Sequence, residues 1–227
     1  RSSPPSMPAT PGHRMNFDMR GHGVVVVGAG GNIGSHLVPH LGRMTSVSRV
    51  TLIDRDTYTS ANLLAQDFQA RDVGKSKARV QVRRLQRTNP ALSVAAFASA
   101  VEDVPPALLR GDVILACLDS RRARQYVNEA AWRLGVPWID SGVAVLGDGS
   151  LLARVTVYVP GAEQPCLECA WDERDYEQLE QTYACGASTP APPPTGAPSA
   201  LGALAAALQA LECRRLLAGE PDLAGRQ

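Results

Sequence analysis

A glycine-rich turn between an apolar run and a helix is the feature that most restricts what this chain can fold into. Residues 24–37 read VVVVGAGGNIGSHL. Four consecutive valines are typical of a strand buried on both faces of a parallel sheet. Gly28, Gly30 and Gly31 would let the backbone approach a phosphate without Cβ clashes, and the helix that follows supplies N–H donors at its start. The segment predicts a nucleotide site, but a redox dinucleotide and ATP both fit it.

Strand-like and helix-like segments alternate through the first two thirds of the chain. Apolar runs predict strands at residues 23–29, 49–56, 92–98, 112–120 and 137–143. Helices are expected at residues 33–44, 74–89 and 121–135, with a short one at 105–111. Such alternation predicts an α/β fold, a doubly wound, Rossmann-like and mostly parallel sheet.

The last third of the chain has a different pattern. Residues 149–161 predict a C-terminal antiparallel extension of the sheet, and residues 165–200 predict a mobile, Cys-bearing crossover loop with a proline-rich stretch. A final helix is expected at residues 199–219, and one of its faces would pack on the sheet or on a partner. That face carries Leu201, Leu204, Leu208 and Leu211.

Composition limits the classes of partner and location. The 227 residues carry a net charge of +1, which argues against nucleic acid as a ligand. Gln209, Glu212 and Arg214 interrupt the most apolar helix, which argues against a membrane span. Five cysteines in scattered contexts favour a reducing, cytoplasmic location. Residues 1–22, rich in Pro and Ser, are expected to form a flexible arm before a single nucleotide-binding domain at residues 23–227.

The spacing of the glycines departs from the dinucleotide fingerprint. The third glycine of G-x-G-x-x-G is expected at position 33, but Ile33 stands there and Gly34 follows. Asp54, at the end of the second predicted strand, could accept both ribose hydroxyls of either NAD or ATP. Lys77 and Asp119 are expected near the same edge of the sheet. A cation and a Mg²⁺-binding carboxylate suit phosphate activation better than hydride transfer.

Six motifs, in order, resemble one family. They are GAGGNIG, LIDRDTYTSANLLAQ, VGKSKA, ACLDS, PCLEC and the Ala/Leu-rich helix, and they span residues 23–219. The chain resembles the ThiF/MoeB/HesA family, the adenylation domain of ubiquitin-activating enzymes and sulfur-carrier activators. The resemblance implies ATP-dependent adenylation of the C-terminal glycine of a ubiquitin-like or sulfur-carrier protein, in a homodimer.

The resemblance also implies roles for individual residues. Gly28, Gly30 and Gly31 would form the nucleotide turn, and Asp54, with Asp56 beside it, would bind the ribose side of ATP. Asn62 and Lys77 would contact the phosphates, and Asp119 would hold Mg²⁺. The residues expected to act in catalysis are Lys77, Asp119 and Cys185, the last as the site of a thioester.

Two departures from the family pattern bear on these roles. The motif N-L-x-R-Q has Ala65 where its phosphate-binding arginine would stand. Cys166 and Cys169 supply one C-x-x-C pair of the two that bind zinc in many members, so zinc binding by this chain stays open.

Cys185 is as consistent with an ordinary loop cysteine as with a nucleophile.

Two other functions remain open on the sequence. An NAD(P)-dependent oxidoreductase is disfavoured by the glycine spacing and by Lys77 with Asp119. A carrier-binding partner subunit without catalytic activity is kept open by Ala65.

Overall fold

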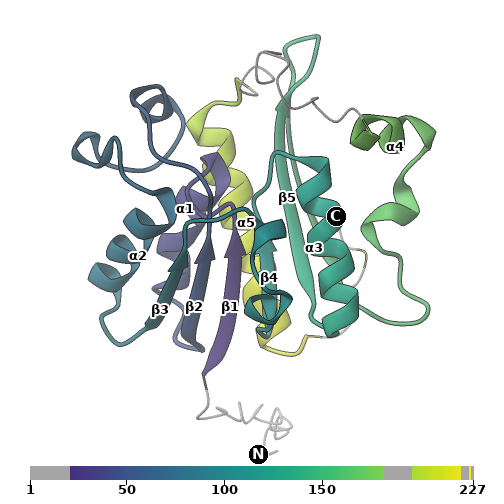
Figure 1. Ribbon diagram of the computed structural model, residues 1–227, viewed down its shortest axis with the longest axis horizontal. Coiled ribbons are helices and arrows are strands. Elements are labelled where there is room, and N and C mark those ends of the chain that lie inside the picture. Colours follow the sequence, from purple (N-terminus) through teal and green to yellow (C-terminus); the bar gives the residue numbers. More distant parts are fainter. Residues whose placement is uncertain (1–20, 181–195, 221–224, 226–227) are drawn as a thin grey trace, which may run out of the picture.

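A computed structural model describes residues 21–180, 196–220 and Gly225 of the chain. One six-stranded sheet runs through it in the order β3-β2-β1-β4-β5-β6 (Figure 1). The strands are β1 (His22–Val27), β2 (Val47–Ile53), β3 (Ser93–Phe97), β4 (Val113–Ala116), β5 (Trp138–Val145) and β6 (Leu151–Tyr158). The first five are parallel to their neighbours and β6 is antiparallel to β5. The Rossmann-like, mostly parallel sheet with an antiparallel extension is therefore confirmed.

Helices cover both faces of the sheet, which explains the unbroken valine run in β1. The helices are α1 (Asn32–Leu41), α2 (Lys77–Thr88), α3 (Arg121–Leu134), α4 (Glu173–Glu180) and α5 (Ser199–Leu217). Val24 and Val26 join a core with α1 and α5, whereas Val25 and Val27 join a second core with α3. Figure 1 shows α3 in front of the sheet and α1 and α5 behind it. Because strand residues alternate between faces, both faces of β1 must be apolar.

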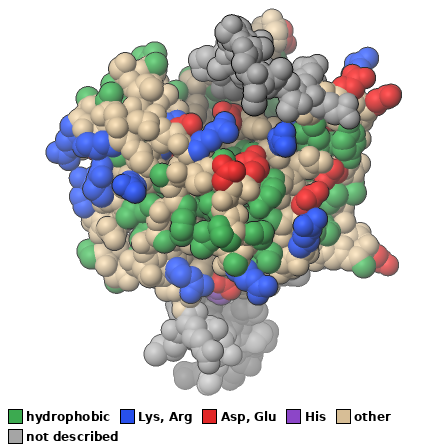
Figure 2. Space-filling model, viewed as in Figure 1, with side chains coloured by type: hydrophobic (Ala, Val, Ile, Leu, Met, Phe, Trp, Pro, Cys, Tyr) green, Lys and Arg blue, Asp and Glu red, His purple; other side chains and the backbone are tan. Residues whose placement is uncertain are grey.

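The basic helix expected at residues 74–89 is α2, at the β3 edge of the sheet. Figure 2 shows Lys and Arg side chains gathered at this edge of the molecule, in keeping with the α2 sequence KARVQVRRLQRT. Arg83 pairs with Asp72 and Arg84 with Asp67. Acidic side chains of the same chain therefore offset part of the positive charge of α2.

The leucine row of α5 does not pack on the sheet, which was one of the two arrangements expected from the sequence. Leu201 is buried, but Leu204, Leu208 and Leu211 are exposed. The side of α5 that packs on α1 and on the sheet carries small residues and one glutamine: Gly202, Ala205, Ala206, Gln209, Ala210 and Cys213. Small residues allow close approach, and a Cβ on Gly202 would lie 2.0 Å from Asn32 Oδ1. Packing of this leucine row on a partner stays a prediction.

The predicted crossover loop at residues 165–200 is described only in part. Its first half contains a 3₁₀ helix, η5 (Leu167–Ala170), and then α4. Cys185 lies outside the described residues, as do residues 1–20 of the predicted N-terminal arm. Within the described ranges, no helix is both long and apolar enough to span a membrane.

Candidate nucleotide site

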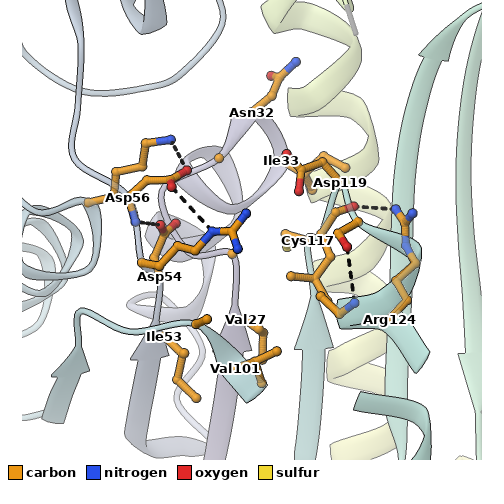
Figure 3. Close-up of a pocket in the computed structure, with 18 of the residues that line it drawn as sticks. Val27, Asn32, Ile33, Ile53, Asp54, Asp56, Val101, Cys117, Asp119 and Arg124 are labelled. Atoms are coloured by element: carbon orange, nitrogen blue, oxygen red, sulfur yellow. Dashed lines mark hydrogen bonds and ion pairs between the residues drawn. The ribbon is translucent and has the colours of Figure 1, made fainter. Parts of the chain in front are cut away.

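A pocket of about 300 Å³ opens at the carboxyl ends of the central strands (Figure 3). Residues that follow β1, β2, β3 and β4 line it, together with Arg124 of α3 and Gly142 of β5. The neighbours of β1 are β2 on one side and β4 on the other, so the chain order reverses here. Ligands of open α/β sheets bind at such a point.

Close packing requires three of the four glycines in the turn. Gly28 has φ +77°, and a Cβ there would lie 2.3 Å from Cys117 O. A Cβ on Gly30 would lie 2.4 Å from Lys77 Cβ, and one on Gly34 would lie 2.1 Å from Gly28 O. Gly31 lines the pocket, and its nearest neighbour would be an ordinary 3.5 Å away. Gly28, Gly30 and Gly34 therefore build the turn, while Gly31 leaves the pocket wall bare of a side chain.

Asp54 joins this turn to the end of β2. Its carboxylate is buried and accepts hydrogen bonds from Gly30 N at 2.8 Å and Asp56 N at 2.9 Å. Burial raises the pKa of the Asp54 carboxyl, although the two backbone donors act against that rise. The predicted acid at the end of the second strand is thus in the pocket wall and fixed by two N–H groups.

Lys77 is a buried cation at the start of α2. Its Nζ lies 3.1 Å from Asp56 Oδ2 and 5.8 Å from the centroid of the Tyr58 ring. Lys77 and Asp56 both line the pocket. The structure therefore brings the predicted lysine and acid together on the β2 side of the cavity.

Asp119 faces them across the cavity. It lies after β4 and lines the pocket with Arg124, as Figure 3 shows. Two hydrogen bonds hold Arg124 in place. Its Nε donates to Asp140 Oδ1 at 2.8 Å, and another of its nitrogens donates to Leu118 O at 2.5 Å. Asp140 has no exposed surface. A fixed guanidinium and a carboxylate thus share the β4 side of the cavity.

Sequence reasoning gave no role to several polar residues that line the pocket, among them Asn32, Gln66 and Arg124. Asn32 Oδ1 and Gln66 Oε1 are buried and accept no hydrogen bond from the described part of the chain. One signal was present for Arg124: in a helix that begins at residue 121, position 124 lies one turn in, close to the strand edge.

A buried polar network lies beneath the pocket. Gln209 of α5 donates from Nε2 to Ala116 O at 3.1 Å and to Ile139 O at 2.9 Å. Its Oε1 accepts from Ser141 Oγ at 2.9 Å and from Cys117 Sγ at 3.2 Å. These bonds fix α5 to the end of β4 and to the first half of β5. Cys117 lies just after β4 and lines the pocket.

We expect the thiols of Cys117 and Cys213 to resist alkylation at pH 8 in the native protein. Burial raises the pKa of each of these two thiols to about 12, so little reactive thiolate is present. Cys169 is exposed and should react. Burial acts to raise the pKa of Cys166, but hydrogen bonds, from Asn128 first and then Cys169, outweigh it and lower that pKa, so Cys166 should react too.

Iodoacetamide labelling followed by peptide mass spectrometry, with and without denaturant, measures this difference. Rapid native labelling of Cys117 would contradict the buried network.

The raised pKa of Cys117 also predicts how pH affects the stability of the protein. Between the ordinary thiol value and about 12, the native state keeps the Cys117 proton that the unfolded state loses. The free energy of unfolding therefore falls as the pH rises through that range.

Four of the predicted site residues that the structure describes do not line the pocket: Gly30 of the turn, Asn62, Cys166 and Cys169. Asn62 does not line it, and its Oδ1 accepts a hydrogen bond from Thr59 N at 3.0 Å. The sulfur atoms of Cys166 and Cys169 lie 3.6 Å apart, close to the edge of about 3.8 Å that a tetrahedral Zn–S site requires. Among the described residues, no group of three or more His, Cys, Asp or Glu side chains could hold a metal ion. The pair thus fits half of a zinc site.

The sheet order, the glycine turn and the polar pocket define a Rossmann-like nucleotide-binding protein. The chain belongs to the ThiF family, because the sequence model of that family matches residues 12–227. This family includes ATP-binding adenylyltransferases, so the resemblance predicted from the six motifs is confirmed.

Individual relatives agree with this membership. The chain is 30% identical, over 89% of its length and 74% of the relative's, to the sulfur carrier protein ThiS adenylyltransferase of Escherichia coli. It is 29% identical to ubiquitin-like modifier-activating enzyme 5 of Oryza sativa, over 76% of this chain and 44% of that protein. A crystal structure of E. coli MccB with AMPCPP and MccA has a TM-score of 0.68 and 25% identity, over 89% of this chain and 57% of MccB. This chain thus spans about half the length of the last two proteins.

Proposed function

We propose that this protein uses ATP to adenylate the C-terminal glycine of a ubiquitin-like or sulfur-carrier protein. The observation that carries the proposal is the placement of Asp54, Lys77 and Asp119 around one pocket at the point where the chain order reverses. The names of the relatives support it, since one adenylates a sulfur carrier and another activates a ubiquitin-like modifier.

The adenosine is proposed to occupy the β2 and β3 side of the pocket. Asp54 would accept the ribose hydroxyls with carboxylate lone pairs that its two backbone donors leave available. Asp56 would hold Lys77 in place while the ammonium group contacts the phosphates. The bare wall at Gly31 and the start of α1 would admit a phosphate close to backbone N–H groups. Asn62, in a 3₁₀ helix at Ser60–Leu64 that does not line the pocket, would contact the phosphates from outside the present cavity wall.

The chemical step needs little beyond positioning. An oxygen of the carrier's terminal carboxylate would bond to the α-phosphorus, and the bond from that phosphorus to the bridging oxygen would break. Pyrophosphate leaves with the bonding electrons, and an acyl-adenylate remains. Mg²⁺, held by Asp119 and by phosphate oxygens, would neutralise the charge on the leaving group. One carboxylate is enough for this metal because the nucleotide supplies other ligands.

Two further roles are proposed on the resemblance alone. Cys185, outside the described residues, would displace AMP and hold the carrier as a thioester. Cys166 and Cys169 would bind zinc together with ligands from elsewhere.

Exchange of labelled pyrophosphate into ATP tests adenylation directly. With Mg²⁺ and a purified sulfur carrier, we expect exchange that disappears when the carrier lacks its terminal glycine. Asp119→Asn should reduce the rate at least about 100-fold, because the metal loses its protein ligand. Asp103→Asn is the matched control, since Asp103 is exposed on the neighbouring Val101–Asp103 turn and does not line the pocket. Equal loss in both variants would contradict the role of Asp119.

Nucleotide titrations distinguish the alternatives. Tight NADH binding without ATP binding would overturn the proposal in favour of an oxidoreductase. ATP binding without exchange would favour a partner subunit without catalytic activity. In that case Ala65→Arg, which restores the family arginine beside pocket residue Gln66, becomes the variant to assay.

A homodimer is proposed as the active form. The exposed row Leu204, Leu208 and Leu211 on α5 supplies apolar surface that suits a second copy. Sedimentation velocity that shows only monomers at micromolar concentration would contradict this proposal.

A further inference from the structure

A second cavity, of about 190 Å³, adjoins the nucleotide pocket. It lies between the start of α3, β6 and the segment formed by η5 and α4. Arg124 lines both cavities, and Arg121, in the second, directly follows Ser120, in the first. A polypeptide whose last carboxylate enters the nucleotide pocket on this side would therefore leave its preceding residues beside the second cavity.

Basic side chains outnumber acidic ones among the residues that line this cavity. Asp140, fully buried, lies 2.8 Å from the Nε of Arg124 and 3.4 Å from a terminal nitrogen of Arg154. Arg121 pairs with Asp175. The cavity lining itself thus carries three guanidinium groups and one carboxylate, and the carboxylate of Asp140 supports two of the three arginines.

Arg154 is the group with spare donors. Its side chain is 42% exposed, and the 3.4 Å contact with Asp140 is its one ion pair among the residues that the structure describes. A guanidinium carries five N–H donors in a planar fork that matches a carboxylate. Trp171, which also lines the cavity, offers an apolar surface for the methylene groups of a bound side chain.

We propose that this second cavity binds an acidic side chain of the polypeptide substrate, a few residues before its C-terminal carboxylate, with Arg154 as the anchoring residue. The inference rests on the proposed function, because it assumes that a C-terminal carboxylate enters the nucleotide pocket. It goes further, since it predicts which carriers are preferred: those with Glu or Asp in the tail near the terminal glycine.

Fluorescence anisotropy of labelled peptides tests this without requiring turnover. The peptides are pairs of heptapeptides with a free C-terminal glycine, and the two members of a pair differ only in carrying Glu or Gln at one position. Three such pairs place that residue third, fourth or fifth from the C-terminal end. We expect one Glu peptide to bind at least about 10-fold more tightly than its Gln partner, as a charge-assisted fork requires. Higher salt should reduce the difference.

Variants assign the effect to Arg154. Arg154→Gln should remove the Glu preference, Arg154→Lys should keep part of it, and Arg133→Gln, at an exposed position on α3, should leave it unchanged. Mg-ATP titrations of the same samples show whether each variant is folded and whether the nucleotide site works. Equal binding of every Glu and Gln pair, no binding of either, or a preference that survives in Arg154→Gln would overturn the inference. Competition by inorganic phosphate as strong as that by the Glu peptide would assign the cavity to a free anion and would also overturn it. Absence of ATP binding is the separate result that counts against the proposed function.

Discussion

Replacing Asp140 with alanine is expected to lower the free energy of unfolding by about 3–5 kcal/mol. Asp140 lies on β5 with no exposed surface and receives the Nε of Arg124 at 2.8 Å and a nitrogen of Arg154 at 3.4 Å. Without it, the largely buried Arg124 guanidinium would keep, among the described residues, only the carbonyl oxygens of Leu118 and Ser141 as acceptors. A charge left uncompensated in that position costs more than the pair contributes.

Urea denaturation followed by circular dichroism measures this loss. The control is Glu129→Ala, which breaks an exposed pair with Arg133 on α3 and should change stability by less than about 1 kcal/mol. Asp140→Asn should fall between the two, because the amide keeps one acceptor for Arg124 but no charge. If Asp140→Ala were no more destabilising than Glu129→Ala, the buried pair would not organise the β4 side of the pocket.

The sequence predicted the sheet because its central strands are buried on both faces. Such strands produce continuous apolar runs, as in β1, and parallel neighbours require intervening helices, which the periodic segments supplied. Asp54, Lys77 and Asp119 were predictable for a related reason. Asp54 and Asp119 follow strands and Lys77 begins a helix, and the parallel strands bring these positions to one edge of the sheet.

Other parts of the site depend on register and on close packing, which the sequence does not express. Arg124 and Asp140 meet because β4 and β5 pair in parallel with Ala116 opposite Asp140. In α5, Leu204 and Leu208 form one row at helical spacing, and Ala205 and Gln209 form another beside it. Both rows could face the sheet. The small row does, because α1 and the strand ends approach too closely for leucine, and Gln209 finds backbone partners there.

Gly34→Ala is expected to lower the free energy of unfolding by about 3 kcal/mol, at the upper end for an overpacked core. The added Cβ would lie 2.1 Å from Gly28 O and 2.8 Å from Ala29 C, and both atoms belong to the backbone of the same turn. No side chain can rotate away to relieve this contact, so either α1 or the turn must move.

Gly31→Ala separates the nucleotide site from the fold. Gly31 has φ −68°, which alanine adopts readily, and its Cβ would meet nothing closer than 3.5 Å. Thermal and urea unfolding should therefore change by less than about 1 kcal/mol. The methyl group would nevertheless stand on the pocket wall where a phosphate is proposed to approach the backbone, so calorimetric titration should show ATP affinity reduced at least about 10-fold. Normal ATP affinity in Gly31→Ala would place the phosphates elsewhere in the pocket, and normal stability in Gly34→Ala would show that the turn can widen without cost.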